Sequence, residues 1–324
     1  MFKYYCILIK VTVKKNIGGI TIMAPFILGQ RQTQPLYLRA SMYMDLSNFI
    51  GEFRNLLMLG EFRGGERYVR LAEFLALIVY NLFVEINYID FYNIKLIPFR
   101  LYCYGSYTGA EREAFNAFKE RLKSLRDVEI YLVERSRGER EKGIDVRLAV
   151  DMLVHAAWNN YDVAILVSGD ADFEPLVRRV RDLGKKVYIT FYPYAIAETL
   201  KDASDGLIDL RLETLVSKPL ADIIINEFRK EFLNSVNRLV EELETRNYFK
   251  PLLGLGGIRE IIKTIKSGIQ SSDLMVIMKS LEDLHKQVSS ADQQLKNQIP
   301  YKHYVRLTFK LMFYKEIIRE YFQR

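Results

Sequence analysis

Residues 163–175 read VAILVSGDADFEP, and this stretch decides the fold. Its apolar first half is typical of a buried strand, which is expected to end at Ser168. Two carboxylates, Asp170 and Asp172, follow, and Pro175 marks the first turn of a helix. Like charges beside a buried strand repel each other and lose hydration. Because Mg²⁺ and Mn²⁺ prefer oxygen ligands, the stretch predicts a divalent-cation site at the carboxyl end of a strand.

Strand-like and helix-like segments alternate on both sides of this stretch. The strands are expected at 38–44, 97–104, 128–133, 163–168, 187–191 and 207–210. Amphipathic helices are expected near 66–85, 110–125, 145–158 and 174–183. This alternation predicts an α/β fold whose parallel sheet is covered by helices on both faces. In such a doubly wound sheet the first and fourth strands are neighbours, and sites lie beyond the carboxyl ends of the strands.

The pattern also predicts how the chain is divided. Residues 1–36 are expected to form an N-terminal leader and residues 37–215 the α/β domain, with an insert at 54–95 to which no function is assigned. Residues 216–324 have helical spacing, which predicts a helical C-terminal region. Its apolar positions are expected to pack in a homodimer, against a protein partner or along the path of an RNA.

The composition is that of a chain with a full core and no membrane span. Of its 324 residues 49% are hydrophobic, and no run of about 18 uncharged apolar residues is present. The cysteines are Cys6 and Cys103, so a disulfide framework is not expected and a reducing cytoplasm fits.

Charge is distributed unevenly along the chain. Residues 1–40 hold six basic and no acidic residues, and residues 216–324 hold 18 basic and 13 acidic ones. Residues 41–215, in contrast, hold 23 basic and 27 acidic residues. Positive flanks around an acidic middle fit a polyanionic partner such as RNA.

Aspartates from separate segments are expected to meet at the carboxyl edge of the sheet. Asp45 ends the first strand, and Asp145 begins a helix. Because the first and fourth strands are neighbours, Asp45 would share a cleft with Asp170 and Asp172. Such a group could hold one or two Mg²⁺ or Mn²⁺ ions for phosphoryl chemistry. Simpler roles are also open: Asp170 could cap the next helix, Asp45 could form a strand-end turn, and Asp145 could favour a helix start.

Three motifs together resemble a known family. The segments MDLSN (44–48), EKGIDV (141–146) and SGDADF (168–173) look like the signature blocks of the NYN domain, in the PIN-like nuclease superfamily. The chain resembles the LabA-like branch most closely, over residues 37–212. The second strand departs from the family pattern, because Gly105-Ser106-Tyr107 follows it where a polar or acidic residue is more usual.

The resemblance implies a metal-dependent ribonuclease on a Rossmann-like PIN fold. It implies that four aspartates are the catalytic, metal-binding carboxylates: Asp45, Asp145, Asp170 and Asp172. Asn48 would be an auxiliary polar group near the metal or substrate. Asp151 matches an acidic helix position of the family and is a fifth candidate metal ligand, although it points about 120° away from Asp145 around the helix.

Basic and aromatic side chains supply candidates for RNA binding. Arg178 and Lys185 belong to a basic cluster on and after the helix that follows the acid pair, and they are expected to contact the RNA backbone, as are Asn48 and Ser168. A solvated helix face would explain the same cluster. Tyr192 and Tyr194 could stack on bases, whereas His155 is expected to be a packed residue.

The sequence is compatible with three classes of function. The leading one is a ribonuclease that uses Mg²⁺ or Mn²⁺. The second is a non-catalytic RNA- or protein-binding module that keeps the same fold. A phosphatase with an aspartyl nucleophile ranks last, because Asp45-Leu46-Ser47 lacks the second aspartate that this chemistry requires.

Overall fold

The computed structural model describes residues 36–62, 64–88, 90–91, 94–136 and 143–323. The expected leader lies outside the described residues except for Leu36, which begins the first strand. Glu141 and Lys142 of the second motif also lie outside them.

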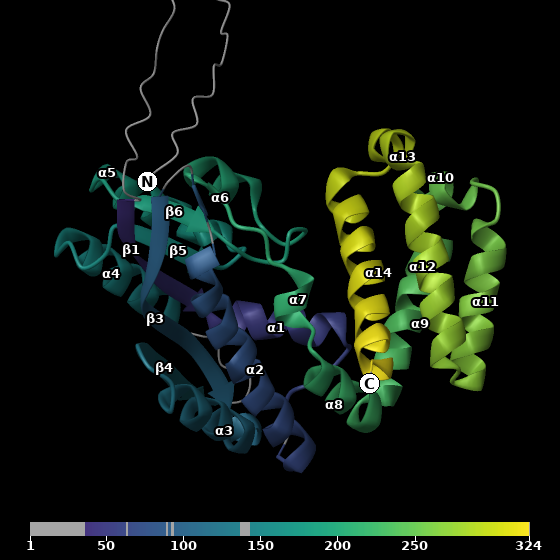
Figure 1. The fold of residues 1–324 in the computed structure, drawn as a ribbon, viewed down its shortest axis with the longest axis horizontal. Coiled ribbons are helices and arrows are strands. Elements are labelled where there is room, and N and C mark those ends of the chain that lie inside the picture. The colour runs from purple at the N-terminus through teal and green to yellow at the C-terminus, as the bar shows by residue number, and fades with distance from the viewer. Residues whose placement is uncertain (1–35, 63, 89, 92–93, 137–142, 324) are drawn as a thin grey trace, which may run out of the picture.

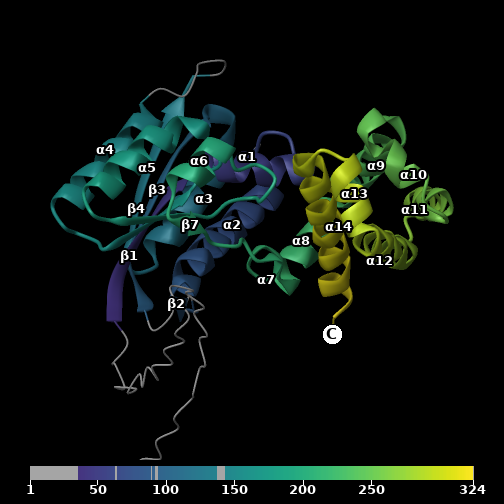
Figure 2. The same ribbon diagram turned by 90° about the horizontal axis from the view of Figure 1, so that it is seen from above.

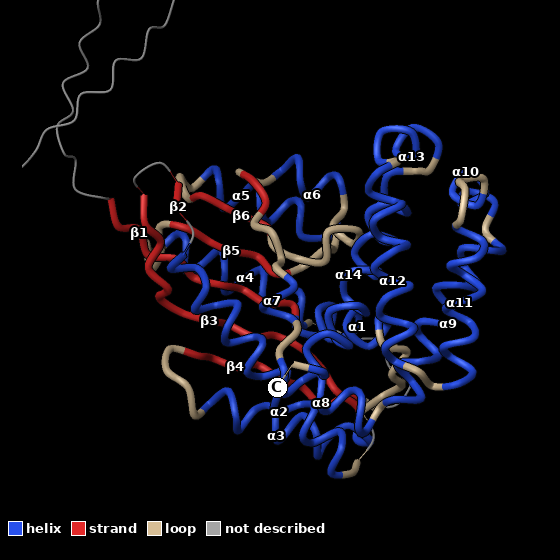
Figure 3. The backbone as a smooth tube through the Cα atoms, turned by 45° about the vertical axis from the view of Figure 1, so that its right-hand side comes forward, coloured by secondary structure: helices blue, strands red, loops and turns tan. Residues whose placement is uncertain are grey.

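Six parallel strands form one sheet, in the order β4-β3-β1-β5-β6-β7 (Figure 3). Their bounds are β1 (Leu36–Asp45), β3 (Ile94–Thr108), β4 (Val128–Arg135), β5 (Val163–Val167), β6 (Lys186–Ile189) and β7 (Gly206–Leu207). The short β2 (Asp90–Phe91) pairs with β3 in the antiparallel sense. The predicted neighbours, the first and fourth parallel strands, are β1 and β5, with Met44 opposite Val167. The predicted α/β fold is confirmed.

Helices cover both faces of the sheet, because successive side chains of a strand point to opposite sides. Tyr43 of β1 packs on the face covered by α4 (Ile144–Ala157), α5 (Glu174–Asp182) and α6 (Glu198–Ala203). Met42 and Met44 pack on the other face, beneath α1 (Leu46–Leu56), α2 (Glu66–Val84) and α3 (Arg112–Lys123). Short turns complete the domain: η1 (Glu85–Tyr88), η2 (Gly109–Glu111), η3 (Ala171–Phe173) and α7 (Leu212–Leu215).

The insert between the first two long strands is a structural part of this second face. Its helix α2 buries Leu75, Ile78 and Val79 in the core. Arg70 of α2 pairs with Glu227 of the C-terminal region at 3.2 Å. The insert therefore joins the sheet to the helices that follow it.

The predicted helical C-terminal region is confirmed, and it stands beside the sheet domain (Figures 1 and 2). Its elements are α8 (Lys218–Glu227), α9 (Arg229–Thr245), η4 (Asn247–Phe249), α10 (Lys250–Leu253), α11 (Ile258–Ser271), α12 (Leu274–Ser290), α13 (Asp292–Gln298) and α14 (Tyr301–Phe322). Helix α8 lies next to the sheet domain, and α14 is the long helix of the region on that side (Figure 1). Phe313 meets Phe53 of α1 edge-on at 6.3 Å, and the Tyr314 hydroxyl donates to the Leu56 carbonyl at 2.7 Å. In the described part of the chain, every helix is too short or too polar to cross a lipid bilayer.

Candidate functional site

Asp45 ends β1 and begins α1. It is only 5% exposed, and its two oxygens accept hydrogen bonds from different elements. One accepts from the Asn48 backbone N–H at 3.0 Å, which caps α1. The other accepts from the Ser168 hydroxyl at 3.0 Å. The cap and the neighbouring strand together fix the carboxylate in one orientation.

Ser168 links this carboxylate to the turn after β5. Its Oγ accepts a hydrogen bond from the Asp170 backbone N–H at 3.2 Å while it donates to Asp45. The side chain is fully buried. Ser168 therefore positions the turn that carries Asp170 and Asp172, hereafter the acidic turn. Because its side chain is buried, Ser168 is not accessible for the expected contact with substrate. The predicted meeting of β1 and β5 does bring Asp45 and Asp170 to the same hydroxyl.

The acid pair Asp170 and Asp172 divides into two environments. Asp170 caps η3, since its Oδ1 accepts from the Asp172 backbone N–H at 3.0 Å. Asp172 is exposed in the first turn that follows. A capping role thus explains why residue 170 is an aspartate. It does not explain why residue 172 is one as well.

Gly169 allows the backbone to turn where the two aspartates begin. A Cβ at this position would lie 2.1 Å from the Ala195 carbonyl oxygen. The Gly169 carbonyl in turn accepts from the Ala197 backbone N–H at 3.0 Å. Only glycine fits this close approach, so the loop after β6 presses directly on the acidic turn.

Asp145 lies on a separate element, the first turn of α4. Gly143 precedes it with a φ of +82°, which sets the direction from which the helix starts. Asp145 is exposed. Among the described residues, no three acidic, histidine or cysteine side chains lie close enough together to hold a metal ion. The structure thus links Asp45 to the backbone of Asp170 through Ser168, and the described residues do not form a group of three ligands there.

Asp151 faces the sheet. Its Oδ2 accepts from the Tyr104 hydroxyl at 3.0 Å and lies 3.5 Å from Nε of Arg147. Burial and the adjacent carboxylate raise the pKa of Tyr104, so the phenol stays protonated as a donor. No pattern in the sequence points to Tyr104 or Arg147, because their meeting depends on how α4 crosses β3.

The basic cluster after β5 is spread over the whole length of α5. Arg178 pairs with Glu174 at the start of the helix. Lys185 donates to Asn159, which precedes β5, so it lies at the amino edge of the sheet, opposite Asp45 and Asp170. The structure therefore does not bring Lys185 to the acids.

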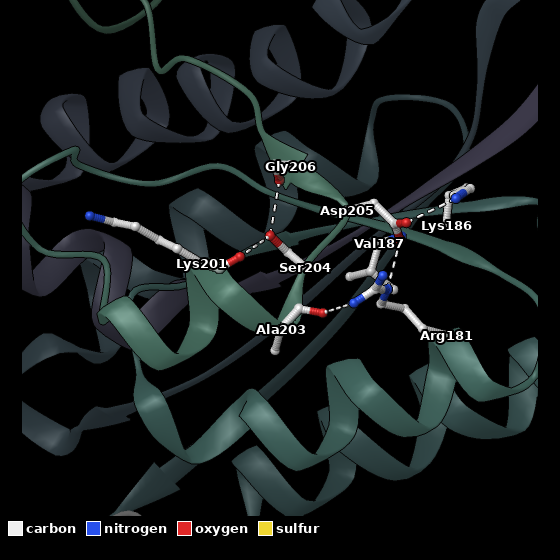
Figure 4. A network of polar contacts seen from close by, with 8 residues as sticks. All are labelled: Arg181, Lys186, Val187, Lys201, Ala203, Ser204, Asp205 and Gly206. Carbon is white, nitrogen blue, oxygen red and sulfur yellow. Dashed lines mark hydrogen bonds and ion pairs between the residues drawn. The ribbon is translucent and has the colours of Figure 1, made fainter. Parts of the chain in front are cut away.

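Two other basic residues hold Asp205 (Figure 4). Arg181 and Lys186 lie 3.1 and 2.9 Å from its carboxylate, which also accepts from the Val187 backbone N–H at 2.9 Å. Burial acts to raise the pKa of Asp205, but these hydrogen bonds and charges outweigh it and lower the pKa. This part of the cluster stabilises the fold around β6 and β7.

The tyrosines considered for base stacking are core residues. Tyr192 is fully buried and Tyr194 nearly so, and both pack against Phe309 of α14. The expectation that they stack on bases is wrong, since the C-terminal region covers them. His155 is packed as expected: it meets the Tyr43 hydroxyl at 2.9 Å, and burial lowers its pKa.

An open cavity of about 940 Å³ lies farther along the carboxyl edge of the sheet. Thr108 at the end of β3 and Arg135 at the end of β4 line it, together with Glu61 and Glu134. The edge that carries Asp45 and Asp170 therefore continues into a hollow with both acidic and basic walls.

Comparison with known proteins identifies the domain. Residues 82–213 match the family model of the NYN domain, so the chain contains an NYN domain. The match begins after β1, although the structure places β1 and Asp45 in the middle of the same sheet. A crystal structure of a protein of unknown function from Vibrio parahaemolyticus is similar at 20% identity and a TM-score of 0.37, covering 56% of this chain and 97% of that one. The comparison with curated proteins gave no match.

Proposed function

We propose that this chain is a ribonuclease that hydrolyses RNA phosphodiester bonds with Mg²⁺ or Mn²⁺ held by carboxylates. NYN domains are generally nucleases, and residues 82–213 belong to that family. The observation that carries the proposal is the joining of Asp45 and Asp170 through one buried hydroxyl. They lie at the carboxyl ends of β1 and β5, where doubly wound sheets bind their ligands.

The donor set fits a hard cation. Asp45 presents carboxylate oxygens beside the Ser168 hydroxyl, and the same hydroxyl accepts from the Asp170 backbone N–H, so the Asp170 carboxylate lies in the adjoining turn. Asp145 and Asp172 start the flanking helical segments and are the further ligands of this proposal. When bound, the ion neutralises charge on the phosphoryl group and lowers the pKa of a water molecule. Asn48, in the first turn of α1, and Arg178, at the middle of α5, would orient the RNA backbone. Asp151 would position Tyr104 and Arg147.

A second function is favoured by one observation. In residues 36–323, within the described ranges, no three potential ligands form a ready-made metal group. A non-catalytic RNA- or protein-binding module would need no such group. It would bind RNA with a strong dependence on salt and would leave the RNA intact.

The test compares RNA cleavage by wild type and Asp170→Asn in the presence of Mn²⁺. Asparagine keeps the shape and the capping ability of aspartate, so the fold is retained while the charge is lost. Because stabilisation of the phosphoryl charge is worth several kcal/mol, the rate should fall by roughly 100-fold or more. Asp182→Asn is the matched control, since Asp182 is exposed at the far end of α5.

Two outcomes would reject the proposal. Equal cleavage by wild type and Asp170→Asn would show that the acidic turn is not the site. Salt-sensitive RNA binding by wild type without any cleavage, at several Mn²⁺ and Mg²⁺ concentrations, would select the non-catalytic module.

A further inference from the structure

A row of side chains leads from the candidate site to the edge of the sheet. Asp45 is opposite Tyr104 in the β1–β3 register, and Tyr104 is opposite Tyr131 in the β3–β4 register. Neighbouring strands are about 4.8 Å apart, so the backbone of Tyr131 lies roughly 10 Å from that of Asp45. Strand β4 pairs with β3 alone among the described strands, which leaves Tyr131 at the edge.

The outer part of this row is a stack of flat groups. The rings of Tyr104 and Tyr131 are stacked, with centroids 5.2 Å apart and planes within 17°. The Arg147 guanidinium lies 3.9 Å from the centre of the Tyr131 ring. About half of the Arg147 side chain, 52%, is exposed. The stack therefore ends in a flat cation that faces solvent.

The polar neighbours of the stack hold it in place. Asp151 accepts from Tyr104 and pairs with Arg147, and Glu129 accepts from the Tyr131 hydroxyl at 3.0 Å. Burial and the hydrogen bond to Glu129 raise the pKa of Tyr131, so this ring remains neutral. An exposed ion pair such as Arg147–Asp151 contributes little to stability, so its arginine can exchange partners readily.

We propose that the Arg147–Tyr131 stack binds a nucleotide of single-stranded RNA next to the bond that is cleaved. The base would stack on the exposed guanidinium plane, as unpaired bases do on arginine and aromatic side chains. Arg147 lies about 200° around α4 from Asp145, on the side that Asp151 occupies, so the link to the candidate site runs through the sheet. Tyr104 of the same stack is opposite Asp45 in the β1–β3 register, so one RNA strand can pass from the stack to Asp45. This inference rests on the proposed ribonuclease function and names the residues that hold its substrate.

The test measures binding of a fluorescein-labelled single-stranded RNA by anisotropy in EDTA, which prevents cleavage. Arg147→Ala should raise Kd by about 5- to 100-fold, the range for loss of one base stack. Arg147→Lys keeps the charge but loses the plane, so it should bind almost as weakly. With Mn²⁺ present, Arg147→Ala should raise KM and leave kcat nearly unchanged.

Arg238→Ala is the matched control. Arg238 is 59% exposed and pairs with Glu242 four residues later at 3.6 Å, which reproduces the charge and geometry of the Arg147–Asp151 pair on a distant helix. It should change Kd by less than about threefold. Circular dichroism confirms that every variant is folded.

The outcomes separate this inference from the ribonuclease proposal. Cleavage by wild type together with an unchanged Kd for Arg147→Ala would overturn the stack and leave the nuclease standing. Full rescue by Arg147→Lys would also overturn it, because charge alone would then explain binding. RNA binding that depends on Arg147 without any cleavage would support the stack and reject the nuclease.

Discussion

The two faces of the sheet are covered in different ways. On the face of α4, α5 and α6 the core is small, and all of its residues lie between Tyr43 and Ala203. On the face of α1, α2 and α3 one continuous core includes Met44 of the sheet and Phe53 of α1, and it extends into the C-terminal helices as far along the chain as Ile318. The first face is complete within the sheet and the helices that cover it, whereas the second is completed by the C-terminal region. That region is therefore part of the fold around the site.

This difference reaches the candidate site through one loop. Tyr192 and Tyr194, which follow β6, pack against Phe309 of α14 on one side. On the other side Ala195 touches the backbone of Gly169. Contact alone does not demonstrate coupling. The contacts of Tyr192, Tyr194 and Ala195 do identify this loop as the place where a change in the C-terminal region would reach the acidic turn.

The largest effect is expected where the shared core is opened. Phe313 is fully buried between α14 and α1, so Phe313→Ala should lower the free energy of unfolding by about 3–5 kcal/mol. Phe322, at the end of the same helix, is 46% exposed, and Phe322→Ala should change stability by less than about 0.5 kcal/mol. Urea unfolding measures both. A loss below about 1 kcal/mol for Phe313→Ala would mean that the C-terminal region is a separable appendage.

Gly169→Ala tests the contact between the loop and the acidic turn. The added methyl group would overlap the Ala195 carbonyl, so either the loop or the Asp170 turn must move. We expect a loss of about 1–3 kcal/mol of stability and a fall in RNA cleavage larger than that loss explains. The control is Gly51→Ala, because Gly51 lies inside α1 with no atom near its added Cβ, and alanine there should stabilise by about 0.5–1 kcal/mol. Unchanged cleavage by folded Gly169→Ala would show that the turn tolerates displacement.

Asp205→Asn tests the face covered by α4, α5 and α6. It removes a carboxylate that accepts from Val187 and pairs with Arg181 and Lys186, so unfolding free energy should fall by about 1–3 kcal/mol. Because the pKa of Asp205 is below its ordinary value of 3.8, its contribution is present above that pH and is lost as pH falls further. The difference between wild type and variant should therefore shrink below about pH 4. Asp182→Asn, with an exposed ion pair, should show neither effect.

The same contrast explains what the sequence could predict. The unbroken apolar run of β5 and the alternation around it are local, and the rule for doubly wound sheets then places Asp45 beside Asp170. Burial of Tyr192 depends on α14, more than 100 residues later, and no local pattern records it. Lys185 is expected from its place just after α5 to contact the RNA backbone, but α5 carries the chain back to the edge of the sheet opposite Asp45 and Asp170. The Arg147–Tyr131 stack joins β4 and α4, whose packing no local pattern fixes.

The smallest expected effect concerns His155, which lies in the last turn of α4 and packs against Tyr43 and Tyr102 of the sheet. Burial lowers its pKa below 6.5, and the nearby charges of Asp151 and Glu129 only partly offset this. The unfolded chain then binds the proton more readily, so stability should fall as pH drops below about 6.5. His285 and His303 also have lowered pKa values, so His155→Gln should remove only part of this slope. Glutamine can still accept from the Tyr43 hydroxyl, which keeps that buried group paired. NMR titration of the imidazole measures the pKa directly, and a midpoint at or above 6.5 would contradict the packed, neutral role of His155 in this core.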